Sequence, residues 1–174
     1  MSPTIVEIRF AEYKALLKVL YDGNEISMAN SAEEDFRKVL TVSAASYFEK
    51  LIVHTLNEIA GSVSDRRMGE ALKNTTFRRE KFSSLFTWGE SNVGGFVKIF
   101  GQQFKEHFLK TLAEPSLKDG MRAFLKLGEQ RNYLVHNDFA SSTTDQTLDE
   151  VFMQYPSARQ FVDHLCEQLR TQNC

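Results

Sequence analysis

The stretch "NSAEEDFRKVLTVSAASYFEKLIVHTLNEIAG", residues 30–61, decides the fold of this chain. It opens with Ser31, and Glu34 follows three residues later, which is the spacing of a capping box at a helix start. Apolar side chains then keep a helical phase, namely Phe36, Leu40, Tyr47, Leu51 and Ile59. The sequence therefore predicts one long core helix over residues 30–61, about 45 Å in length.

Helical patterns also flank this stretch on both sides. Residues 1–23 form a predicted N-terminal helix that ends at Gly23, with inward side chains at Tyr13, Leu16, Leu17 and Leu20. Three segments are expected after the long helix: a short helix over residues 65–74, a loop or broken helix over residues 82–95, and a helix over residues 96–113. The middle segment is rich in glycine and is expected to bury its aromatic side chains, Phe82, Phe86 and Trp88.

Two more helices complete the predicted chain. The first covers residues 116–137, and the second covers residues 147–170, with Thr147 and Glu150 as a capping box and a break at Pro156. No segment alternates apolar and polar residues with a period of two. The sequence therefore predicts an all-α fold, in which residues 1–174 form a single domain.

The bulk composition is that of a globular, reduced protein. Hydrophobic residues make up 42% and charged residues 25% of the 174 residues, which is far from the disordered class. Cys166 and Cys174 lie about 12 Å apart on a continuous helix, too far for a disulfide between them. The sequence shows neither an apolar run of membrane-spanning length nor the layout of a signal peptide. We therefore expect a cytoplasmic protein without membrane association.

Charge is unevenly distributed along the chain, although the net charge is only −2. Residues 65–81 contain three acidic residues and six basic ones, namely Arg66, Arg67, Lys73, Arg78, Arg79 and Lys81, a local balance of +3. Residues 138–174 have six acidic and two basic residues, a balance of −4. The basic segment is either an ordinary solvated surface or a patch that faces phosphates.

Few residues are arranged for catalysis. The four histidines are dispersed, no Cys-x-x-Cys occurs, and "NVGGF" lacks the spacing of a nucleotide-binding loop. We therefore predict no metal site and no cofactor. The exception is "GEQRNYLVHNDF", residues 128–139, which places Arg131, Asn132 and His136 within six residues.

This segment allows two interpretations. Arginine suits phosphate binding and histidine suits proton transfer near neutral pH, while Asn132 and His136 share a helix face at i, i+4. Alternatively, Arg131 pairs with a glutamate, His136 bonds a carbonyl and Asn137 caps the helix end. Pattern alone does not decide between a catalytic and a structural role.

The segment "RNYLVHND" resembles the R-x(4–6)-H motif of the HEPN superfamily, with Arg131, the polar Asn132 after it, and His136. The stretches "SAASYFEKLIVHTLNEI" and "SLFTWGESNVGGFVKIFGQQFKEHF" are similar to the RiboL-PSP-type branch of that superfamily. The resemblance covers roughly residues 32–169. It implies a HEPN-like helical bundle built on two long helices plus shorter ones.

The resemblance also implies an activity, namely metal-independent cleavage of RNA. HEPN domains dimerise and bring two R-x(4–6)-H motifs into one cleft, where the 2′-hydroxyl of RNA attacks the adjacent phosphate. His136 would act as acid and base, Arg131 would hold the phosphate, and Asn132 would orient them. The product would carry a 2′,3′-cyclic phosphate, and the protein would be a toxin or antiphage defence effector that works as a homodimer.

Further roles follow from the same resemblance. HEPN proteins often carry a polar residue that faces the motif from a long helix, for which Glu49 is the candidate and Ser46 the next, with Asn137 as a third supporting residue. The basic residues Arg66, Arg67, Arg78, Arg79 and Lys81 would guide RNA. Some HEPN toxins have a modifiable tyrosine two residues after the histidine, where this chain has Asp138. A nucleotidyltransferase partner is therefore not expected, although an antitoxin or defence-system partner is.

Two rival hypotheses stay open. In the first, the chain is a non-catalytic HEPN adaptor or antitoxin module that binds RNA or a partner protein. In the second, it is an unrelated helical regulatory domain in which the motif is accidental.

Overall fold

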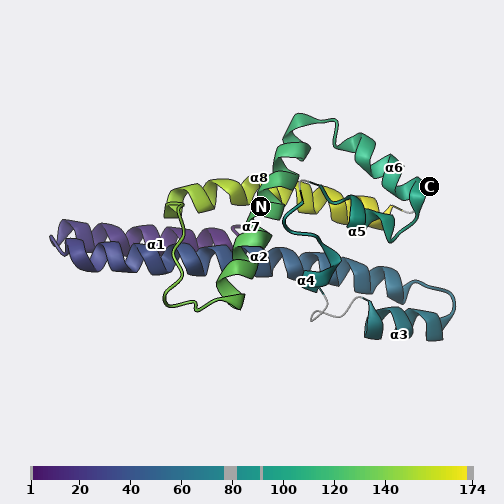
Figure 1. The fold of residues 1–174 in the computed structure, drawn as a ribbon, viewed down its shortest axis with the longest axis horizontal. Coiled ribbons are helices and arrows are strands. Elements are labelled where there is room, and N and C mark those ends of the chain that lie inside the picture. The colour runs from purple at the N-terminus through teal and green to yellow at the C-terminus, as the bar shows by residue number, and fades with distance from the viewer. Residues whose placement is uncertain (1, 77–81, 91, 172–174) are drawn as a thin grey trace.

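The computed structural model describes residues 2–76, 82–90 and 92–171, and these residues form helices joined by loops (Figure 1). The helices are α1 (Ile5–Asp22), α2 (Ile26–Gly61), α3 (Arg66–Thr75), α4 (Phe82–Leu85), α5 (Gly94–Lys98), α6 (Gln102–Thr111), α7 (Pro115–His136) and α8 (Leu148–Arg170). The described ranges contain no strand. The predicted all-α class is therefore confirmed.

Helix α2 is the frame of the molecule. Its 36 residues span about 54 Å, and α1, α3, α7 and α8 all pack against it. Figure 1 shows α1 running antiparallel to the first part of α2, while α7 crosses both α2 and α8. The end of α7 consequently lies in front of the middle of α2, which is where the candidate motif is found.

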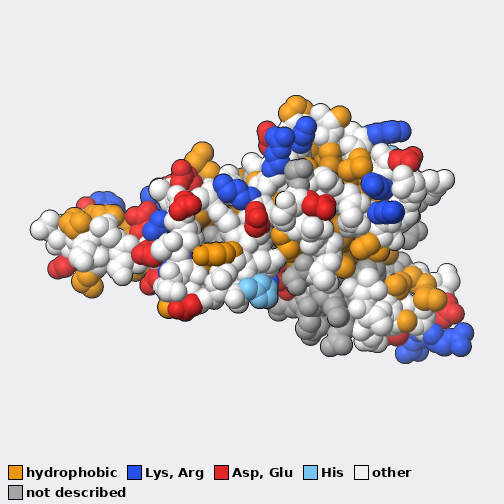
Figure 2. Space-filling model, viewed as in Figure 1, with side chains coloured by type: hydrophobic (Ala, Val, Ile, Leu, Met, Phe, Trp, Pro, Cys, Tyr) orange, Lys and Arg blue, Asp and Glu red, His pale blue; other side chains and the backbone are white. Residues whose placement is uncertain are grey.

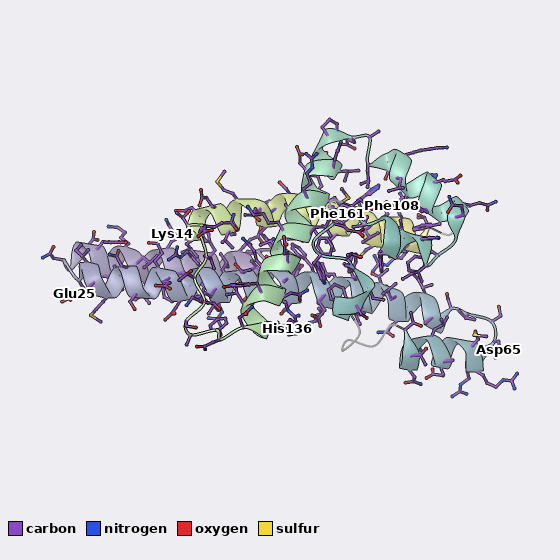
Figure 3. The ribbon with its side chains drawn as sticks, viewed as in Figure 1. Lys14, Glu25, Asp65, Phe108, His136 and Phe161 are labelled. Atoms are coloured by element: carbon purple, nitrogen blue, oxygen red, sulfur yellow. The ribbon has the colours of Figure 1, made fainter. Side chains whose placement is uncertain are left out.

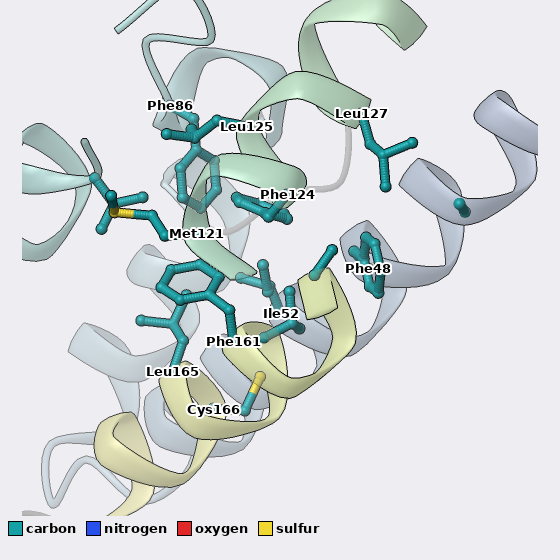
Figure 4. Close-up of a cluster of buried hydrophobic side chains, with 14 of the residues drawn as sticks. Phe48, Ile52, Phe86, Met121, Phe124, Leu125, Leu127, Phe161, Leu165 and Cys166 are labelled. Atoms are coloured by element: carbon teal, nitrogen blue, oxygen red, sulfur yellow. The ribbon is translucent and has the colours of Figure 1, made fainter. Parts of the chain in front are cut away.

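Aromatic side chains fill the space where α2, α7 and α8 meet. Phe48 of α2 stacks on Tyr155 of α8 with ring centroids 5.4 Å apart, and Phe124 of α7 contacts Phe161 of α8 at 5.6 Å. All four are almost completely buried. Figure 4 shows aromatic and aliphatic side chains of the three helices converging at this crossing. This packing fixes the angle at which α7 carries the motif across α2.

Some helix ends and one helix face differ from the predicted pattern. Helix α2 begins at Ile26 rather than at the capping-box position Ser31, and its additional first turn buries Ala29. The helix expected over residues 96–113 is divided into α5 and α6 at Gly101, whose φ of 104° belongs to the left-handed region. Leu16, predicted to face inward on α1, is 47% exposed.

Helix α8 runs through Pro156 without the predicted break. Proline removes one backbone donor, but α8 is held along its length by α2 and α7. Thr147 and Glu150 form the predicted capping box at its start. None of the helices in the described part of the chain combines the length and apolar character that a membrane crossing requires.

Candidate active site

The motif occupies the last turns of α7. Arg131 points toward α2, where its Nη2 lies 3.8 Å from Oε2 of Glu49. The Glu49 side chain is only 7% exposed and that of Arg131 is 26% exposed. The Arg131 Nη1 also donates to Oδ1 of Asn132 at 3.0 Å. A charged guanidinium is thus held between α2 and its own helix, with part of its surface open to solvent.

His136 is the last residue of α7 and lies exposed (Figure 3). Four residues lie between it and Arg131, and this five-residue step turns the two side chains about 140° apart on the helix. At the corresponding place in Figure 2, a histidine side chain is open on the surface. The site therefore combines a partly buried cation with a solvent-accessible titratable ring.

Three apolar residues within three positions of His136 in the sequence are exposed. Tyr133 is 52% exposed, Val135 44% and Phe139 40%. We call these three residues the α7-end patch. Such clustering next to a charged site is typical of a surface that another molecule covers.

The floor below Arg131 is aromatic and closed. A cavity of about 10 Å³ lies there, with Phe48, Trp88 and Phe124 among its walls. This volume holds about one water molecule and no nucleotide. Any phosphate bound by Arg131 must therefore approach from the solvent side.

Gly128 opens the motif segment and has a packing role. A Cβ atom at this position would lie 2.0 Å from ring atoms of Trp88. The indole therefore sits directly on the backbone of α7, one turn before Arg131. The sequence predicted that Trp88 would be buried; the side chain is half-buried and packs against the hydrophobic core.

Two basic residues of α2 hold the loop that follows His136, and sequence reasoning did not identify them. The Lys38 side chain is only 2% exposed, and its Nζ donates to the carbonyl oxygen of Ala140 at 3.2 Å. The Arg37 Nη1 donates to the carbonyl oxygens of Thr144 and Gln146 at 3.3 and 3.2 Å. Their only signal in the sequence is a basic pair that follows an acidic cluster after one intervening residue, Phe36.

Residues after His136 shape the same loop. The Asn137 side chain donates to the carbonyl oxygen of Tyr133 at 2.7 Å, so it caps α7 as the structural interpretation predicted. Asp138 occupies the position at which some HEPN toxins carry tyrosine. Its Oδ1 accepts the Ala140 backbone N–H at 3.2 Å, and its carbonyl oxygen accepts from Ser142 at 2.6 Å. Asp138 therefore forms the turn that leads away from the site.

The remaining predicted residues lie elsewhere. Ser46 is on α2 one turn before Glu49, and it lines a groove on another side of that helix. Arg66 and Arg67 are exposed on α3. Arg78, Arg79 and Lys81 lie outside the described residues. The structure thus brings Arg131, Asn132 and Glu49 together, and it places His136 on the adjoining surface.

Other titratable groups have structural surroundings. Burial raises the pKa of the Cys166 thiol, which disfavours the reactive thiolate. Burial lowers the pKa of His164, whose ring bonds the Thr111 hydroxyl at 2.9 Å. Within residues 2–76, 82–90 and 92–171, no three His, Cys, Asp or Glu side chains gather as metal ligands would.

The fold and the site define an all-helical domain that presents an Arg-Asn-x-x-x-His segment at the end of its penultimate helix. The chain belongs to the RiboL-PSP-HEPN family, whose model matches residues 6–171. The predicted resemblance is therefore confirmed. HEPN domains are often ribonucleases, and they commonly bind RNA and dimerise. No curated protein and no solved structure matches the chain.

Proposed function

We propose that this protein is an endoribonuclease that needs no metal ion and whose active site is completed by a second copy of the chain. The observation that carries the proposal is that Arg131, partly open and held by Glu49, and an exposed His136 lie on the same helix end. Family membership supports an RNA-related role.

RNA cleavage through the 2′-hydroxyl needs three catalytic groups. A base removes the hydroxyl proton, an acid protonates the leaving 5′-oxygen, and a cation stabilises the crowded phosphorane. Arg131 supplies the cation, because Glu49 and Asn132 fix its guanidinium and leave a side open for phosphate. His136 supplies one proton-transfer group.

One motif has a single histidine, so the second proton-transfer group has to come from elsewhere. A twofold axis next to the α7-end patch would bring a second His136 and a second Arg131 to the same phosphate. The exposed Tyr133, Val135 and Phe139 give that contact an apolar surface to bury. Such a nuclease would serve as a toxin or antiphage effector, restrained by a partner protein.

The test is RNA cleavage in the presence of EDTA. Wild-type protein should cleave and leave 2′,3′-cyclic phosphate ends, whereas His136→Ala and Arg131→Ala should not, although both stay folded by circular dichroism. His107→Ala, an exposed histidine of α6, is the matched control and should retain activity. Full activity in the His136 variant would refute the assignment.

Subunit mixing tests whether the site is composite. Arg131→Ala and His136→Ala chains are each expected to be inactive alone. An excess of His136→Ala chains mixed with wild-type protein should lower cleavage per wild-type chain, because each mixed dimer has one histidine where the reaction needs two. Val135→Asp should separate the two copies of the dimer, and the same variant should also lose RNA cleavage. If a strictly monomeric protein cleaves RNA, the composite site is wrong. If the wild-type dimer binds RNA without cleaving it, the protein is a non-catalytic HEPN module.

A further inference from the structure

A second feature of α2 has no role in the site described above. A groove of about 890 Å³ runs along the outer face of this helix, on the side away from the core. Its α2 residues extend from Ser43 to Asn57, which is about 21 Å along the helix axis. Ile5 and Arg9 at the start of α1 form one wall.

The groove exists because neighbouring helices stop short of this face. Helix α1 begins at Ile5 and covers only the first part of α2 (Figure 1). Helix α3 packs against the last turn of α2, where Gly69 lies against the carbonyl oxygen of Ala60. Among the residues that the structure describes, none of these helices covers the outer face of α2 between α1 and α3.

The charge of the groove is distinctive. Its lining includes Arg9, Lys50 and His54 and contains no aspartate or glutamate. Arg9 and His54 do contact carboxylates, Glu12 at 2.8 Å and Glu58 at 3.5 Å, but neither of these glutamates lines the groove.

A second large groove gives the contrast. It runs along α8, measures about 690 Å³, and is lined by four carboxylates, those of Glu7, Glu114, Asp163 and Glu167, against one arginine, Arg159, and one histidine, His164. In a protein with a net charge of −2, an anionic polymer is repelled by that groove and favoured by the one on α2.

The other side chains of the α2 groove suit an unpaired strand. Ser43, Ser46 and Asn57 offer hydrogen-bonding groups, and Leu51 and Val53 offer apolar surface. Cations for phosphates, together with polar and apolar contacts for ribose and exposed bases, are what single-stranded RNA requires. Duplex RNA hides its base faces and would leave the apolar wall unused.

The groove lies on another side of α2 from Glu49, the residue that contacts Arg131. Lys50, near the middle of the groove, directly follows Glu49 and is therefore turned about 100° from it around the helix axis. We propose that the α2 groove binds single-stranded RNA and that the strand passes around α2 to reach Arg131. This inference rests on the proposed function for its direction, but the binding itself does not depend on catalysis.

Binding is measured by fluorescence anisotropy with a labelled single-stranded RNA whose riboses are 2′-O-methylated, so that it cannot be cleaved. Lys50→Glu and His54→Glu should each weaken binding several-fold. Each lysine–phosphate contact that is lost should also reduce the slope of log affinity against log salt by about 1. Lys110→Glu, the same charge change on the exposed surface of α6, should leave both quantities unchanged. A duplex of the same sequence should bind more weakly than the single strand.

Several results would overturn the inference. These are no binding by the wild-type protein, equal binding by the groove variants and wild type, or equal loss in the Lys110 control. Sedimentation of each variant identifies the other possible occupant: if Lys50→Glu separates the copies but leaves RNA affinity unchanged, the groove is an interface between copies. Cleavage is scored separately. Binding that depends on the groove, without any cleavage of RNA, would refute the proposed nuclease and support the groove. Normal cleavage, with equal binding by the groove variants and the wild type, would support the nuclease and refute the groove.

Discussion

Tyr155 connects the start of α1 to α8, and its hydroxyl allows a quantitative test of how the groove wall is held. The side chain is completely buried, and its hydroxyl donates to Oγ1 of Thr4 at 2.9 Å. Thr4 caps α1, and the next residue, Ile5, lines the α2 groove. Replacement of Tyr155 by phenylalanine keeps the ring and removes only this bond.

The expected loss at pH 8 is that of one buried hydrogen bond, about 1 kcal/mol. At higher pH the comparison changes, because burial raises the pKa of Tyr155 from its ordinary value of 10.0 to about 12. A raised pKa means that the folded state keeps a proton that the unfolded state releases. The part of the free energy of unfolding that depends on protonated Tyr155 is therefore complete below pH 10 and is lost between pH 10 and 12.

At pH 11 the wild-type protein is one unit above the ordinary pKa and one unit below the raised one. Tyr155 alone then reduces its free energy of unfolding by about 1.4 kcal/mol relative to pH 8. Tyr155→Phe lacks this titration, while all other tyrosines and lysines titrate equally in both proteins. The variant should therefore be less stable at pH 8 and equal to or slightly more stable than wild type at pH 11.

The assay is urea unfolding, followed by far-ultraviolet circular dichroism, at pH 8, 10 and 11. The informative quantity is the difference between the two proteins at each pH. A difference that stays constant from pH 8 to 11 would show that the hydroxyl is not buried and bonded as described. Loss of folding by the variant at pH 8 would show that the Tyr155 hydroxyl stabilises the fold by far more than the free energy of one hydrogen bond.

Three further perturbations test the site and its supports. Gly128→Ala should destabilise the protein by about 1–3 kcal/mol through the clash with Trp88, reduced by at most about 1 kcal/mol of gained helix propensity. Urea unfolding measures this, and Gly95→Ala in α5 is the control that gains helix propensity without a clash and so should not destabilise the protein. Lys38→Met should lower the hydrogen-exchange protection of the loop after α7, while the core stays protected. Unchanged exchange in this loop would show that Lys38 does not hold it in place. Bonds from Thr4 lower the pKa of Glu7, so wild type should lose stability below about pH 4.5 more steeply than Glu7→Gln, as acid-range urea unfolding would show; parallel curves would contradict this.

Much of the helical layout could be predicted because its signals are local. Thr147 and Glu150 mark the start of α8, and Gly23 marks the end of α1, through contacts within three or four residues. The early start of α2 and the exposure of Leu16 depend instead on which faces meet in the α1–α2 pair. The periodicity of the sequence identifies the apolar face of a helix, but it does not identify the helix against which that face packs.

The candidate site shows the same limit. Arg131, Asn132 and His136 could be singled out because they lie within six residues, and Asn137 caps α7 through a contact four residues away. The approach of Glu49 to Arg131 depends on the crossing of α2 and α7, and a family resemblance, rather than spacing, suggested it. Lys38 escaped notice because its carbonyl acceptor, Ala140, lies 102 residues further along the chain.

The two halves of the motif have opposite surroundings, and this bears on how a nuclease site would assemble. Arg131 is fixed by a buried carboxylate and a neighbouring amide, so little ordering is left to do when phosphate binds. His136 stands on an exposed helix end beside apolar side chains, while Lys38 and Arg37 secure the loop behind it. Arg131 would be the fixed cation and His136 the accessible base, next to an exposed apolar surface. Together they form half of a site, which a second copy of the chain would complete. For that reason we place the regulation of the proposed activity in the association of two chains rather than in a rearrangement within one.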